Sequence, residues 1–188
     1  MATSRVFWLS MGLQSVAAIF VLGLVALGAK PPADDVAWGA ADHGLRMGLA
    51  FGPTSPEPQL RVVFQNVDRP ECLIPLGSMS AKGSVYDIEF RVTSPSGKDS
   101  PLFNFNGPPG IQHEAKPIVL EIPKGQKREI LLSLNKLIFL DDGKNRPLTE
   151  MLAQHYSVRA MVDTSGDARY TRTLSQWMGK VVSGELKR

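Results

Sequence analysis

The chain has 188 residues, 43% of them hydrophobic and 21% charged, a composition that is ordinary for a globular protein. The formal net charge is only +3 and the basic residues are spread along the sequence, so we expect no nucleic-acid partner. The only cysteine, Cys72, excludes an intrachain disulfide, and we expect its thiol to be buried as a small apolar group.

The N-terminal 29 residues contain an apolar segment that predicts export. Residues 6–29 carry no charge, and Arg5 precedes them. The densest part, residues 16–29, has the length of a signal-peptide core, and Ala26 and Gly28 near its end are small residues at the two positions that a signal peptidase reads. The 24 uncharged residues are also long enough to cross a bilayer as an uncleaved helix. Residues 1–29 are therefore expected to be a signal peptide or a membrane anchor.

Both alternatives export the rest of the chain. We expect an extracytoplasmic protein, periplasmic or secreted, that touches the membrane only through residues 6–29 and only if that segment is uncleaved. Residues 30–37 contain two prolines and two aspartates and predict a linker. The exported domain is then expected to occupy residues 38–187.

From Trp38 onward, short segments with apolar residues at every second position replace the apolar run. This alternation predicts strands at residues 45–51, 60–67, 85–94, 117–123, 128–134, 155–163 and 168–174, with strand-like segments at 72–77 and 177–186. Residues rich in Gly, Pro, Asp and Ser separate them, residues 124–127 read as a hairpin connection, and residues 148–154 predict one helical turn.

These eight or nine short strands, with no long amphipathic helix, predict an all-β sandwich or barrel. Leu152, Tyr156, Val158 and Ala160 favour the immunoglobulin/fibronectin-like kind, in which a tyrosine at the start of a strand bonds back to the upstream backbone. A plain buried aromatic residue fits the same pattern. The expected fold is an immunoglobulin/fibronectin-like β-sandwich preceded by an N-terminal hydrophobic signal or anchor helix.

Candidate metal ligands are few and separated. His43, His113 and His155 do not lie within metal-ligand spacing, and neither HxH, HExxH nor CxxC occurs. A thioether beside an imidazole suits copper, which makes His43 with Met47 an alternative site. Met47, however, falls in the apolar set of a predicted strand, where methionine is a common core filler. We therefore expect no metal and no cofactor.

Catalytic motifs are equally scarce. GxSxG is missing, and Ser183 has no local partner. Asp141 and Asp142 stand among turn residues and predict a solvated turn. We expect the protein not to be an enzyme, with a hydrolase as the alternative, because a dispersed triad is set by spatial geometry and leaves no motif.

The irregular stretch of residues 101–116 is the strongest sequence candidate for a contact surface. Phe103 and Phe105 share one parity within it, and long loops that carry aromatic residues are often functional. Alternatively, both phenylalanines cap an open end of the core. The candidate ligand or partner contacts are His43, Phe103, Phe105 and His113.

Two motifs stand at the ends of the exported domain. W-G-x4-G-L-x3-L covers residues 38–49, W-x-G-x-V-x-S covers residues 177–183, and FQNVDRPECLIPLG lies between them at 64–77. The combination resembles small exported bacterial immunoglobulin-like β-sandwich proteins that are themselves uncharacterised. The resemblance implies the fold and an extracytoplasmic location, and it carries over no functional residues.

The function expected from these observations is that of an exported noncatalytic module, binding or structural, at the cell envelope. Its partner is expected to be an unknown protein or another envelope component. A periplasmic copper- or other metal-binding protein is one alternative, and a hydrolase with a dispersed site is the other.

Overall fold

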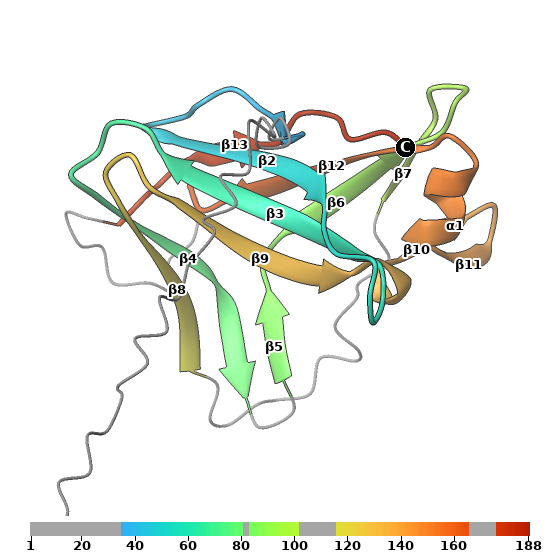
Figure 1. Ribbon diagram of the computed structural model, residues 1–188, viewed down its shortest axis with the longest axis horizontal. Helices are drawn as coiled ribbons and strands as arrows, with labels where there is room; N and C mark the ends of the chain where they lie inside the picture. The colour runs from blue at the N-terminus through green and yellow to red at the C-terminus, as the bar shows by residue number, and fades with distance from the viewer. Residues whose placement is uncertain (1–34, 81–82, 102–115, 166–175) are drawn as a thin grey trace, which may run out of the picture. The chain divides into compact units, whose positions relative to one another are not determined.

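The alternating apolar residues form strands, and the computed structural model is mostly β, which confirms the all-β class. It describes residues 35–80, 83–101, 116–165 and 176–188 (Figure 1). Residues Asp34–Arg188 form a unit separate from Met1–Ala33. The predicted signal or anchor segment lies outside the described residues. Within the part of the chain that is described, no helix has the length and apolar character needed to cross a membrane.

The strands are short, and helix is limited to one α-helix and one 3-10 turn among the described residues. In chain order the elements are β1 (Ala37–Trp38), β2 (Leu45–Phe51), β3 (Gln59–Asn66), β4 (Glu71–Ser80), β5 (Gly83–Tyr86), β6 (Glu89–Thr93), β7 (Asp99–Pro101), β8 (Lys116–Pro123), β9 (Lys127–Ser133), η1 (Leu134–Lys136), β10 (Ile138–Asp141), β11 (Lys144–Pro147), α1 (Leu148–Ala153), β12 (Ser157–Asp163) and β13 (Lys180–Val182).

The strands pair in four antiparallel sheets. The β2–β3 sheet has the order β1-β2-β3-β9, the β6–β12 sheet has the order β13-β12-β6-β7, and the β4–β8 sheet has the order β5-β4-β8. The fourth sheet is the hairpin β10-β11, which lies beside α1 at one end of the unit (Figure 1). The strand predicted at residues 168–174 lies outside the described residues.

Side chains from the three larger sheets meet in one hydrophobic core. The inward residues are Leu45, Met47 and Leu49 of β2, Leu60, Val62 and Phe64 of β3, Cys72, Ile74 and Leu76 of β4, Phe90 and Val92 of β6, Ile122 of β8, and Val158, Ala160 and Val162 of β12. Full burial of one such large side chain stabilises a fold by about 1.5–3 kcal/mol. The prediction that Met47 is a core residue is confirmed, because its side chain is fully buried.

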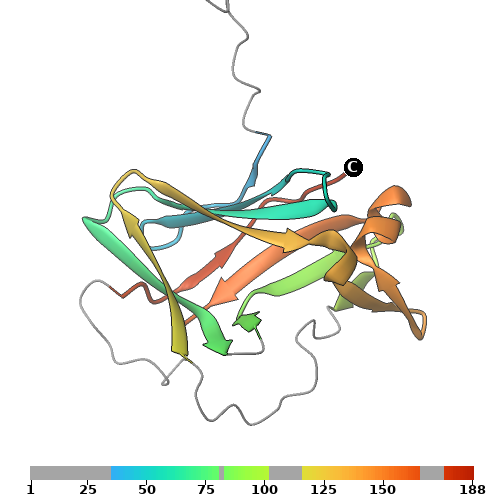
Figure 2. The ribbon, with the colours of Figure 1, turned by 60° about the horizontal axis from the view of Figure 1, so that its bottom comes forward.

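Asn66 holds the corner where the chain passes between the β2–β3 and β4–β8 sheets. The β3–β4 and β8–β9 connections lie side by side, and each carries the chain between these two sheets (Figure 2). The fully buried Asn66 side chain donates from Nδ2 to the carbonyl oxygens of Arg69 and Ile122, each at 2.9 Å. Its Oδ1 accepts the Arg69 backbone N–H at 3.0 Å. The amide therefore ties the β3–β4 connection to the end of β8.

Two glycines let the β2–β3 sheet meet the C-terminal strand backbone to backbone. The Gly184 N–H donates to the Ala37 carbonyl oxygen at 3.0 Å. A Cβ on Gly39 would lie 1.7 Å from the Val182 carbonyl oxygen, and a Cβ on Gly184 would lie 2.7 Å from that of Trp38. Only residues without a side chain permit this approach.

The β10-β11 hairpin corrects two expectations. Asp142 and Gly143 form its turn with φ of 46° and 77°, the conformation that Asp-Gly favours in two-residue hairpins. Asp141 is not solvated, because its side chain is 9% exposed and its Oδ2 lies 2.7 Å from Arg146 Nη1. The Tyr156 hydroxyl donates to the same Oδ2 at 3.0 Å. Tyr156 thus bonds to a side chain, whereas the tyrosine-corner interpretation required the upstream backbone.

Candidate ligand-binding groove

The outer face of the β6–β12 sheet carries mainly polar side chains, because apolar and polar residues alternate along its two central strands and the apolar ones face the core. In β12 the inward Val158, Ala160 and Val162 leave Arg159 and Met161 facing outward. In β6 the inward Phe90 and Val92 leave Glu89, Arg91 and Thr93 outward, as the alternation in the sequence predicts. This face therefore presents charge above an apolar core.

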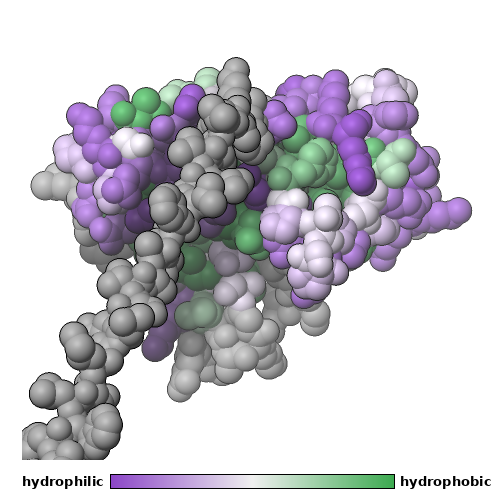
Figure 3. All heavy atoms as spheres, viewed as in Figure 1, coloured by the Kyte–Doolittle hydropathy of each residue, from purple (hydrophilic) through white to green (hydrophobic). Residues whose placement is uncertain are grey.

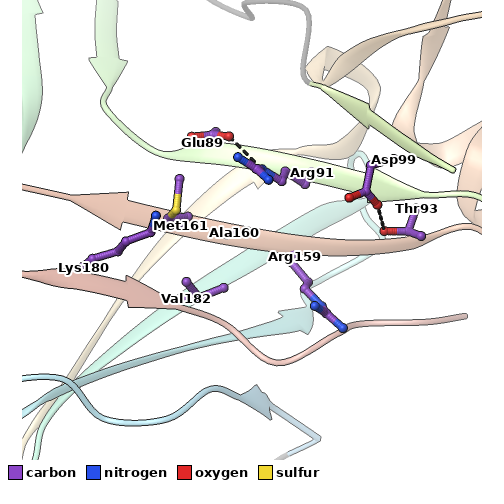
Figure 4. A pocket seen from close by; sticks show the side chains of 9 residues that line it. All are labelled: Glu89, Arg91, Thr93, Asp99, Arg159, Ala160, Met161, Lys180 and Val182. Carbon is purple, nitrogen blue, oxygen red and sulfur yellow. Dashed lines mark hydrogen bonds and ion pairs between the residues drawn. The ribbon is translucent and has the colours of Figure 1, made fainter. Parts of the chain in front are cut away.

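A groove of about 250 Å³ lies on this outer face (Figure 4). All four strands of the sheet contribute to it, so side chains far apart in the sequence converge there. Its lining consists of Glu89, Arg91, Thr93, Asp99, Arg159, Ala160, Met161, Lys180 and Val182.

Arg91 and Arg159 are direct neighbours across β6 and β12. Like charges at directly opposite positions in an antiparallel pair are destabilising. Arg91 turns toward its own strand, where its Nε donates to Glu89 Oε1 at 2.9 Å. Arg159 points away from β6 (Figure 4). The two guanidinium groups are thus splayed apart, as their repulsion favours.

Arg159 is a surplus cation of this face. Its nearest carboxylate oxygen among the described residues is Oε2 of Glu185, at 3.7 Å from Nη2. Glu185 already accepts a hydrogen bond from the Ser157 hydroxyl and lies 3.3 Å from Lys187 Nζ. The Ser157 hydrogen bond, followed by Lys187 and Arg159, holds the pKa of Glu185 below its usual value. Glu185 is therefore satisfied without Arg159.

The remaining side chains give the groove a mixed rim and an apolar floor. Asp99 is engaged, because it accepts the Thr93 hydroxyl hydrogen bond at 2.7 Å. Lys180 adds a third cation from β13. Met161 and Val182 face each other across β12 and β13, and Val182 is 38% exposed. The arrangement can hold an anion beside an apolar group.

His43, the predicted contact residue within the described part, lies near the start of β13. Its side chain is 68% exposed, and Nδ1 lies 2.9 Å from Asp42 Oδ1. Asp42 Oδ2 accepts the Lys180 backbone N–H at 3.0 Å. The His43 hydrogen bond, with that of Lys180, lowers the pKa of Asp42. His43 thus has one acidic partner, and this partner is bonded to a strand that lines the groove.

The other predicted candidates do not assemble around His43 in the structure. Met47 is buried in the core, whereas His43 is exposed, so the pair proposed for copper is not brought together. His155 is exposed at φ 62°, just after α1. Phe103, Phe105 and His113 lie outside the described residues. Of the residues that the structure describes, no three His, Cys, Asp or Glu side chains are grouped so that they could hold a metal ion.

Cys72 behaves as expected from its place in an apolar segment. It is fully buried, and burial raises the pKa of its thiol to about 11 against a smaller opposing effect of Arg69. The thiolate that a nucleophile or metal ligand requires is therefore disfavoured at neutral pH.

Exposed apolar side chains do not mark a second site among the described residues. The large ones are Phe51, Val67, Met79, Val119, Leu131, Leu140 and Val182, which come from seven different segments. In the view of Figure 3 hydrophilic residues dominate the rim, and apolar residues show between them. Single apolar residues of this kind are normal on a protein surface.

Sequence reasoning missed the groove, although the alternation is consistent with its side chains lying on the outer face. Alternation alone puts Arg91 and Arg159 on outer faces. Their adjacency depends on the pairing of β6 with β12, and neither segment alone specifies the register of two strands about 68 residues apart in sequence.

No protein-family model, curated protein or solved structure matches this chain.

Proposed function

We propose that this chain is an exported noncatalytic binding module of the cell envelope, with an immunoglobulin/fibronectin-like β-sandwich fold. Its binding surface is the groove on the outer face of the β6–β12 sheet. The observation that carries the proposal is the surplus positive charge of this groove, where the ion pair of Arg159 among the described residues is a 3.7 Å contact with Glu185, a carboxylate that Lys187 shares.

The fold part of the proposal rests on the layering of the sheets. Two four-stranded antiparallel sheets contribute inward residues to one core, which is the principle of a sandwich. The β4–β8 sheet and the β10-β11 hairpin are additions to that plan. The resemblance of the two end motifs to small exported bacterial sandwich proteins points the same way.

A binding role fits the groove better than catalysis does. The described residues that line it include no histidine, cysteine or serine. Guanidinium groups donate hydrogen bonds but do not lose their proton near neutral pH. Both lining carboxylates, Glu89 and Asp99, are hydrogen-bonded to neighbours. The groups present are therefore suited to holding a ligand and poorly suited to proton transfer.

Thiol crosslinking in intact cells tests export and the groove together. Met161→Cys places a thiol in the groove. Leu131→Cys places a thiol outside the groove, at a position of the β2–β3 sheet where the native side chain is 46% exposed. The buried Cys72 gives little background, since its pKa is about 11. With a membrane-impermeant bifunctional maleimide, we expect both new thiols to react and only the Met161→Cys variant to give a discrete crosslinked adduct.

Two outcomes contradict the proposal. If both introduced thiols react only after the cytoplasmic membrane is broken, the domain is not exported. If both react in intact cells but give the same pattern of adducts, the groove is not the binding surface. The unmodified chain serves as the control for any reaction at Cys72.

A further inference from the structure

We propose that the groove binds an oxyanion, a phosphate or carboxylate group, between Arg91 and Arg159. This inference rests on the proposed function and names the chemical class that the groove takes. Lys180 supplies a third positive charge, and Met161 and Val182 contact the apolar part of the ligand.

The first support is the register. Arg159 pairs with Arg91 across β12 and β6, and repulsion between neighbouring like charges weakens such a pair. An anion between the two side chains turns this repulsion into attraction to a shared partner. Two arginines at facing positions are thus unfavourable in the empty protein and favourable in the complex.

The second support is the supply of free donors. No hydrogen bond from Arg159 to another described residue is present, and Arg91 uses only its Nε, toward Glu89, within the same part of the chain. The terminal nitrogens of Arg91 are therefore available to an anion, and those of Arg159 have only the 3.7 Å contact of Nη2 with Glu185 to give up. Their planar forks match the oxygen spacing of carboxylate and phosphate, which a lysine ammonium does not.

The third support is the small movement that binding requires. The side chains of Arg91 and Arg159 are 59% and 56% exposed, so both can change rotamer without disturbing the core. Glu185 keeps Ser157 and Lys187 as partners when Arg159 turns toward Arg91. Among the described residues, no buried group loses a hydrogen bond on ligand binding.

Anion titration of the protein as recovered from the exporting cell tests the inference. The probes are inorganic phosphate and phenylphosphonate, each compared with sodium chloride at equal ionic strength, and binding is followed by calorimetry. We expect phenylphosphonate to bind more tightly than phosphate because its ring reaches Met161 and Val182. Arg159→Gln should raise the dissociation constant at least about tenfold, which corresponds to about 1.4 kcal/mol.

Arg128→Gln is the matched control, because it removes one exposed charge from β9, in the β2–β3 sheet. It should change the dissociation constant by less than about twofold, as screening limits long-range effects. Arg159→Lys keeps the charge but loses the fork, and should fall between the two. The thermal midpoint without ligand should be no lower in Arg159→Gln than in the unmodified protein, since no essential ion pair is lost.

The inference is overturned if the unmodified protein binds neither probe, or if Arg159→Gln and Arg128→Gln bind equally. Arg159-dependent binding to vesicles containing phosphatidylglycerol, but not to phosphatidylcholine vesicles, identifies a lipid headgroup as the source of the oxyanion. Arg159-dependent binding to phenylphosphonate alone identifies a soluble ligand. If the Met161→Cys variant gives a crosslinked adduct but the protein binds neither anion, the inference of an oxyanion ligand is overturned and the proposed binding function is retained.

Discussion

At the scale of single residues, Asn66 shows what makes a buried polar side chain tolerable. An unpaired amide in an apolar core is costly, and a fully hydrogen-bonded one is not. Asn66 is fully buried, yet its side chain makes three hydrogen bonds to the backbone of Arg69 and Ile122. The sequence alone does not mark it, because Asn66 falls within the strand predicted at residues 60–67 and nothing in that pattern singles it out.

Replacement of Asn66 by Ala is expected to destabilise the protein by about 2–4 kcal/mol, because it removes three hydrogen bonds to the backbone of Arg69 and of the buried Ile122. Urea unfolding followed by far-ultraviolet circular dichroism measures the change. Asn145→Ala, an exposed asparagine of β11, is the control and should shift stability by less than about 0.5 kcal/mol. Equal effects of the two substitutions would show that Asn66 does not hold the corner.

At the scale of elements, Asp141 and Arg146 of the β10-β11 hairpin bond to side chains of the short segment that links α1 to β12. Arg146 Nη1 lies 2.7 Å from Asp141 Oδ2, and its Nη2 donates to Gln154 at 2.7 Å. The Tyr156 hydroxyl donates to Asp141 as well. Sequence reasoning treated Asp141 as solvated because two adjacent acids in a turn usually are, and only the pairing of β10 with β11 reveals which acid faces Arg146.

The stability that Asp141 contributes should depend on pH. The hydrogen bond from Arg146, and next that from Tyr156, lowers the pKa of Asp141 from 3.8. A lowered folded-state pKa means that the contribution is complete above the unfolded value, near pH 4, and is lost as pH falls through the folded value. Asp141→Asn should therefore destabilise the protein at pH 7, and the difference from the unmodified protein should shrink below about pH 4.

Thermal unfolding from about pH 7 to about pH 2.5 measures this difference across the window in which the carboxylate is protonated. Asp142→Asn is the control, because the neighbouring Asp142 side chain is 81% exposed and its ion pair with Lys98 is a surface pair of little energetic weight. A deficit of Asp141→Asn that stays constant down to the acid end of this range would argue against an ionised Asp141 in the folded state.

Strands with a clear alternation of apolar and polar residues were predictable from the sequence. Strands that are short or interrupted, and that are recognised only by their pairing with a neighbouring strand, were not. β2, β3, β9 and β12 lie within one or two residues of their predicted bounds, and β6 occupies the second half of the strand predicted at residues 85–94. β10 and β11 were missed because four-residue strands carry too little periodicity, and residues 140–147 were interpreted as a turn. β4 was recognised only in part, since Pro75 and the register shift at Gly77 interrupt its pattern.

At the scale of the molecule, the arrangement depends on contacts between strands that are distant in sequence. Trp38 packs on the outer face of the β2–β3 sheet, with Val36, Ala50 and Val63, and the Arg46 guanidinium lies 4.3 Å from the centre of its ring. Gly48 leaves room for this ring, since a Cβ there would lie 2.9 Å from it. Such a placement follows from the β1–β2 register, which no local pattern specifies.

Gly39→Ala tests whether residues 37–39 and residues 182–184 are joined as described. The new Cβ would lie 1.7 Å from the Val182 carbonyl oxygen, so β1 must move away from β13. Because backbone cannot yield as a flexible side chain does, we expect a loss of at least about 2 kcal/mol in unfolding free energy. Hydrogen exchange should show that amide protection falls in β1 and β13 together, while β8 and β9 keep theirs.

Gly52→Ala is the control. Its new Cβ meets mainly side-chain atoms of Arg61 and Gln59, each at 3.1 Å, and we expect a clearly smaller loss of unfolding free energy. Unchanged stability of Gly39→Ala would mean that β1 does not pack against the backbone of residues 182–184.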